Sequence, residues 1–95
     1  MEKQDHLYQT LKKLEKAAEE GDLKEAMAVN RKEFIPEYAE HFGIGHTKDN
    51  DEARLYDLAR NNLLYSIEEG GMFDPKGRKE RLKDAKKYIK EIEDL

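Results

Sequence analysis

Apolar residues recur along this chain at intervals of three and four positions, and glycine-containing breaks separate four such segments. This spacing places the apolar side chains on one side of an α-helix, so the chain predicts four amphipathic helices. No segment shows the strict alternation that is typical of a half-buried strand. The four expected inner stripes are Leu7, Leu11, Leu14 and Ala18; Leu23, Met27, Phe34 and Tyr38; Tyr56, Ala59, Leu63 and Ile67; and Leu82, Ala85, Ile89 and Ile92.

Capping residues predict the bounds of the first two helices, 2–20 and 23–42. Gly21 suits the left-handed conformation that commonly ends a helix. Asp22 then caps the second helix, and Glu25 lies three residues further on, as in a capping box. The two helices are therefore expected to form an antiparallel hairpin with a tight link.

Proline interrupts the second helix at position 36. Pro36 has no N–H to donate, and in a regular helix its ring clashes with the carbonyl of Lys32. For this reason we expect a kink or a break near Ile35.

The third helix follows a loop that begins after Gly43. Thr47 or Asp49 is expected to cap this helix, which continues to Glu69. The fourth helix is expected to begin at Pro75, since proline is favoured at the first position of a helix.

Short links between four helices favour an all-α fold. We expect a four-helix, up-down antiparallel bundle that forms a single domain over residues 1–95, a length that suits one domain. Two stacked helical hairpins are the alternative arrangement.

Composition narrows the classes of function. The chain has no cysteine, which excludes disulfides, thiolate metal sites and cysteine nucleophiles. No apolar run reaches the ~18 residues of a membrane span, and the N-terminus does not resemble a secretory signal. We therefore expect a soluble, cytoplasmic protein without a membrane partner.

The net charge is −4, and no aromatic residues alternate with the lysines of the fourth helix, which argues against a nucleic-acid partner. Those lysines, interpreted as a solvated face, are Lys79, Lys83, Lys86, Lys87 and Lys90.

Small residues surround the turn between the first two helices: Ala17 and Ala18 precede Gly21, and Ala26 follows it. On these positions the segment 14–34 resembles a tetratricopeptide (TPR) helix pair. Residues 82–89 also resemble part of such a pair. The separation of this segment from segment 14–34 along the chain differs from the family's repeat period of about 34 residues. The resemblance implies a packed helical hairpin, and it carries over no peptide-binding residue.

The helices are rich in Glu, Lys, Leu and Ala, a Gly-Asp link joins the first two, and an Asp-Pro pair precedes the last. With no Cys and no Trp, these features also resemble those of computationally designed helical bundles. Pro36 and the irregular loop 43–48 depart from that pattern. This second resemblance implies an engineered module without enzymatic activity.

The three histidines are expected at one end of an up-down bundle. His6 begins the first helix, His41 ends the second, and His46 lies in the loop that follows. Glu37 precedes His41 by one helical turn, so both side chains can reach one ion. One interpretation is a divalent transition-metal site made by these four residues, or an acid–base site with His41 and Glu37 as catalytic candidates. The other is three histidines at solvated helix ends, with no cofactor.

Two asparagines fall on or beside inner stripes, Asn30 in the second helix and Asn62 in the third. Buried amides need hydrogen-bond partners, and the two asparagines can pair with each other or with Tyr56 or Tyr65. The four residues either fix the register of the helices or line a pocket for a small polar ligand.

Taken together, the sequence favours a helical domain without catalysis that binds a protein or peptide partner. Leu58, Leu64 and Tyr65 lie outside the inner stripe of the third helix, which makes a homodimer another candidate. The histidine site and the asparagine-lined pocket stay as the alternatives.

Overall fold

The helices predicted from the sequence occur in the computed structural model, which describes residues 5–43, 50–67 and 75–95. Within these residues all regular structure is helical, so the predicted all-α fold is confirmed. The elements are α1 (Asp5–Glu19), α2 (Leu23–Val29), the π-helical turn η1 (Asn30–Phe34), α3 (Ile35–Phe42), α4 (Asp51–Ile67) and α6 (Pro75–Glu93). Because α2, η1 and α3 follow one another without a break, the described chain forms four helices.

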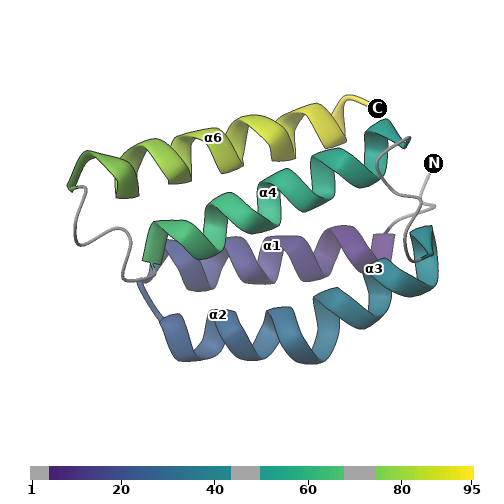
Figure 1. Cartoon of the computed structure of the whole chain (residues 1–95), viewed down its shortest axis with the longest axis horizontal. Helices are drawn as coiled ribbons and strands as arrows, with labels where there is room; N and C mark the ends of the chain where they lie inside the picture. Colours follow the sequence, from purple (N-terminus) through teal and green to yellow (C-terminus); the bar gives the residue numbers. More distant parts are fainter. Residues whose placement is uncertain (1–4, 44–49, 68–74) are drawn as a thin grey trace.

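The four helices alternate in direction along the chain (Figure 1). Polar side chains connect each helix to the next, and the last helix to the first, so the helices surround one core. This arrangement is the predicted up-down antiparallel bundle. The contacts that mark its four sides are Lys13 with Glu33, Tyr38 with the carbonyl of Ala53, Arg81 with Asn62, and Lys86 with Glu19.

One cluster of buried side chains lies between the helices. It includes the whole expected stripe of α1, which is at most 2% exposed at each position. Aromatic rings of α3 and α4 continue the cluster, with ring centroids 5.9 Å apart for Phe42 and Tyr56. The largest side chains in its centre are Tyr56, Phe34, Leu11, Leu14 and Leu63.

The link between α1 and α2 follows the predicted chemistry. Gly21 has a φ of 72°, and its N–H donates to the carbonyl of Ala18 at 3.0 Å. The N–H of Asp22 donates to the carbonyl of Ala17 at 2.9 Å, which completes a Schellman motif. The Asp22 carboxylate accepts from the N–H of Glu25 at 3.0 Å, so the predicted cap is confirmed.

The chain remains helical through Pro36 and does not break. The helix changes direction between α2 and α3 (Figure 1). In the preceding turn the N–H of Ile35 donates to the carbonyl of Asn30, five residues back. Such a π turn contains one residue more than an α turn. Pro36, which has no N–H, is the second residue of α3 and follows this π turn directly.

The extra residue of η1 changes which side chains face the core. In an α-helix, residues spaced by four positions are not exactly in line, so a row of them drifts slowly around the helix. The wider π turn shifts the row in the opposite direction and cancels this drift. Ala26, Asn30 and Phe34 are therefore buried in succession. Leu23 is 41% exposed, so the prediction that it faces inward is wrong.

Asn50 caps α4, whereas the sequence predicted Thr47 or Asp49, which lie outside the described residues. The side-chain oxygen of Asn50 accepts from the N–H of Ala53 at 3.0 Å, and its carbonyl accepts from Arg54 at 2.9 Å. These two bonds satisfy the first backbone donors of the helix.

Candidate functional site

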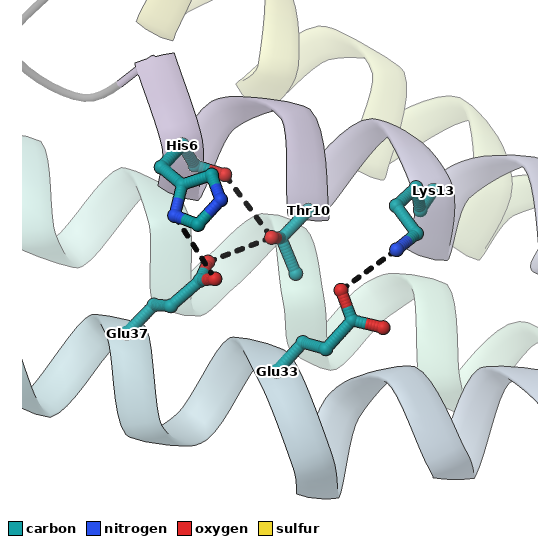
Figure 2. Close-up of polar contacts among 5 residues, drawn as sticks. All are labelled: His6, Thr10, Lys13, Glu33 and Glu37. Atoms are coloured by element: carbon teal, nitrogen blue, oxygen red, sulfur yellow. Dashed lines mark hydrogen bonds and ion pairs between the residues drawn. The ribbon is translucent and has the colours of Figure 1, made fainter.

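A group of polar side chains joins α1 to η1 and α3 (Figure 2). The carboxylate of Glu37 lies between two residues of α1. Its Oε2 atom is 3.3 Å from Nδ1 of His6, and its Oε1 atom is 2.7 Å from the hydroxyl oxygen of Thr10. The same hydroxyl is 3.0 Å from the backbone carbonyl of His6. One carboxylate therefore holds two positions of α1 against α3.

Burial differs sharply within this group. Thr10 is 3% exposed, the Glu37 side chain 20% and the His6 side chain 86%. The Thr10 hydroxyl carries one proton, and the ionised carboxylate is its stronger acceptor. Thr10 and Glu37 thus form the protected half of the group, and His6 the half in contact with solvent.

Lys13 and Glu33 form a second contact along the same side, at 2.7 Å between Nζ and Oε1 (Figure 2). The hydrogen bond to Glu33 raises the pKa of Lys13 above its usual range. Glu33 of η1 and Glu37 of α3 therefore both face α1 and have partners there.

The predicted histidine set is only partly assembled. Glu37 lies against His6, whereas His41 is exposed and packs edge-on against Phe42, with ring centroids 5.2 Å apart. His46 lies outside the described residues. Within the described ranges, no three His, Asp or Glu side chains come together in a way that could hold a metal ion.

Asn62 connects α4 to α6. It is buried, donates to the carbonyl of Leu58 at 2.8 Å, and accepts from Arg81 at 3.4 Å. The guanidinium of Arg81 also lies over the ring of Tyr65, 5.1 Å from its centroid, and Tyr65 is 48% exposed. Asn62 thus takes part in a contact between α4 and α6.

Asn30 lies elsewhere, in η1, and is 8% exposed. Its Oδ1 atom is buried without a hydrogen-bond partner among the described residues, and so is Nε of Arg60 in α4. The Arg60 guanidinium contacts Asp57 and lies 5.6 Å from the ring centroid of Phe34. The buried ring of Tyr56 packs on Phe42.

Sequence reasoning did not identify Thr10, Arg60 or Arg81. Thr10 had a usable signal, because it falls between Leu7 and Leu14 on the stripe that faces the core. Arg60 and Arg81 had none, since their contacts depend on which helices become neighbours.

None of the helices within the described ranges is long and apolar enough to cross a membrane. No family model matches the chain, and neither the curated proteins nor the solved structures include a significant match.

Proposed function

We propose that this chain is a helical binding domain that recognises a protein or peptide partner, without catalysis. The observation that supports the proposal is the exposure of two large aliphatic side chains on one helix. Leu23 is 41% exposed and Ile35 is 47% exposed. Both belong to α2–η1–α3, the helix whose buried row packs against the rest of the core.

The two side chains lie in one row. Residues spaced by four positions stay in line along this helix, and Met27 and Arg31 lie between Leu23 and Ile35. Met27 is partly buried and Arg31 is exposed. A row of this kind offers apolar anchors along one side of a helix, which is how helical modules commonly take up peptides.

Selection from a random peptide display library tests the proposal. We expect enriched peptides to change the amide chemical shifts of residues 23–35 when added to the folded chain. The L23S/I35S double variant should lose affinity for them by about tenfold or more, which corresponds to about 1.4 kcal/mol.

The matched control is Tyr65→Ser, which removes an equally exposed apolar side chain from α4. Exposed substitutions of this kind change the free energy of unfolding by about 0.5 kcal/mol or less, so all variants should remain folded. Enriched peptides that bind L23S/I35S as well as the original chain would refute the proposal. Sedimentation over a range of concentrations shows whether a second copy of the chain is the partner instead.

A second candidate function is a site at His6, which the contact with Glu37 favours. A carboxylate on Nδ1 of an imidazole orients the ring and leaves Nε2 as the metal ligand or base. The Nε2 atom of His6 makes no hydrogen bond with the described residues. Glu37 would then act as the orienting partner, in place of the direct ligand role that the sequence predicted.

Metal titration separates this candidate from the first. A metal ion that binds only the native state raises the melting temperature. If zinc, cobalt and nickel leave the melting curve unchanged, or raise it equally for His6→Ala, the site at His6 is refuted.

A further inference from the structure

We infer that the partner is an acidic, amphipathic helical segment that lies along the outer face of α2, η1 and α3. This inference rests on the function proposed above and specifies the chemistry of the partner. The outer face consists of two adjacent rows of residues spaced by four. These rows are Leu23, Met27, Arg31 and Ile35, and Lys24, Ala28, Lys32 and Pro36. Met27 and Ala28 are partly buried, and Met27 packs against the core, so the exposed positions are the other six.

Positive charge is concentrated on this face. Lys24, Arg31 and Lys32 are exposed, and none of them makes an ion pair with another residue of the described ranges. The two rows contain no Asp or Glu. The chain as a whole carries a net charge of −4, so the basic face is a local feature and not a result of overall composition.

Four glutamates belong to the same helix: Glu25 and Glu40 are exposed, with Glu40 one turn beyond Pro36, and the other two face α1. Glu33 accepts a hydrogen bond from Lys13, and Glu37 lies between Thr10 and His6 (Figure 2). These carboxylates are matched within the bundle, by residues of α1. The cations of the outer face have no such partners, and carboxylates of a bound segment can supply them.

The dimensions of the face fit a short helix. Leu23 and Ile35 are separated by twelve residues, or about 18 Å along a helix axis. A partner helix of about 12–16 residues spans this length. Its apolar side chains would contact Leu23 and Ile35, and its carboxylates would pair with the cations between them. Arg31 suits this role, because a guanidinium binds a carboxylate through two parallel hydrogen bonds.

Nucleic acid and membrane surfaces fit the same face less well. Its two rows contain no aromatic side chain on which a base could stack. A membrane-bound amphipathic helix presents one broad apolar side to the lipid. Here Arg31 and Lys32 lie among the apolar positions. Such a face suits a partner on which apolar and charged side chains alternate.

Two synthetic peptides of about 16 residues test the inference. They share leucines at every fourth position and carry either glutamate or lysine at the positions beside them. Binding is measured by fluorescence anisotropy with the whole chain at about 0.15 M salt, where only close charge pairs escape screening. We expect the acidic peptide to bind at least about tenfold more tightly than the basic one.

Charge reversal on the outer face provides the decisive comparison. R31E/K32E should weaken binding of the acidic peptide by about tenfold or more and strengthen binding of the basic one. K83E/K87E, the same charge change on exposed positions of α6, should leave both affinities within about twofold. Thermal melting of each variant confirms that the fold is retained.

Several results would overturn the inference. Equal affinity for both peptides would do so, as would acidic-peptide binding that R31E/K32E does not change. Binding of phosphatidylserine vesicles or single-stranded RNA through Arg31 and Lys32, without binding of the acidic peptide, would identify another class of partner. In each case the proposed function is retained if the L23S/I35S variant still loses affinity for the display-selected peptides. It is refuted only if that affinity is unchanged.

Discussion

The backbone N–H of Ile35 donates to the carbonyl of Asn30, five residues earlier, in the turn that precedes Pro36. This single π turn decides which sides of the second helix meet the core, α1 and solvent. The buried row, the glutamates beside α1 and the basic outer face all depend on it. Single π turns inside α-helices occur frequently at functional sites, and this one lies within the helix for which we propose a binding face.

Deletion of Lys32 tests this interpretation of η1. Removing one residue from a π turn converts it to an α turn and leaves the faces of α2 and α3 in register. We expect a cooperative thermal transition that is lowered by roughly 4–8 °C, the shift for a loss of about 1 kcal/mol in a domain of this size.

Deletion of Asn61 from α4 is the matched control. There the loss of one residue rotates every later side chain of the helix by about 100°. Cooperative melting should disappear, because buried positions such as Leu63 and Leu64 would leave the core. Equal damage from the two deletions would show that η1 carries no extra residue.

Thr10→Val tests the contact between α1 and α3. Valine has the shape of threonine but cannot donate to Glu37, whose carboxylate is largely buried. We expect a loss of about 1.5–3 kcal/mol in the free energy of unfolding, measured in urea, as for other hydrogen bonds to charged groups.

His6→Ala should have a much smaller effect on the same free energy. The His6 side chain is mostly exposed, and exposed ion pairs contribute about 0–1 kcal/mol. If the histidine variant is destabilised as much as the threonine variant, the buried half of the group is not the part that holds the helices together.

Asn50→Ala tests the cap of α4. Loss of the side-chain acceptor for the N–H of Ala53 should lower the free energy of unfolding by about 1 kcal/mol. Asn50→Asp and Asn50→Ser keep an acceptor and should differ from the original chain by a few tenths of a kcal/mol, roughly. A neutral alanine variant would mean that another residue caps the helix.

Tyr8 predicts a loss of stability at alkaline pH. Burial, then the hydrogen bond to Glu93 and the negative charges of Glu93 and Glu15, raise the pKa of Tyr8 from 10.0 to about 12. Between these values the unfolded chain releases the Tyr8 proton while the folded chain keeps it, so unfolding becomes more favourable as the pH rises. The stabilisation is complete below pH 10 and falls until about pH 12.

The free energy of unfolding, measured between pH 9 and about 12, checks this expectation. Tyr8→Phe should make the decline shallower, because phenylalanine has no proton to lose. Glu93→Gln should reduce it in part, since the effect of burial remains. An unchanged decline in Tyr8→Phe would show that Tyr8 does not titrate differently in the two states.

Local rules predicted much of the fold from the sequence. Gly21 and Asp22 define the first link through short-range backbone chemistry, which needs no knowledge of the rest of the chain. The stripe that includes Leu11 and Leu14 is buried as its spacing predicted. Periodicity identifies such elements because each residue of a regular helix is rotated by the same angle from the residue before it.

The errors arose where that regularity ends. Pro36 correctly indicated a change in the helix. The regular period of 3.6 residues could not show that the turn before Pro36 contains one extra residue. Leu23 was therefore predicted to face the core. The cap of α4 was assigned incorrectly because several residues of capping type follow one another and periodicity does not choose among them. Glu37 was grouped with all three histidines. The packing of α1 against α3 brings it to His6, whereas His41 is exposed.

Scalar coupling across hydrogen bonds, measured by nuclear magnetic resonance on a labelled sample, tests the π turn most directly. The amide nitrogen of Ile35 should couple to the carbonyl carbon of Asn30. A coupling from Ile35 to the carbonyl carbon of Arg31 would instead show an ordinary α turn, and the outer face described above would then not exist as one surface.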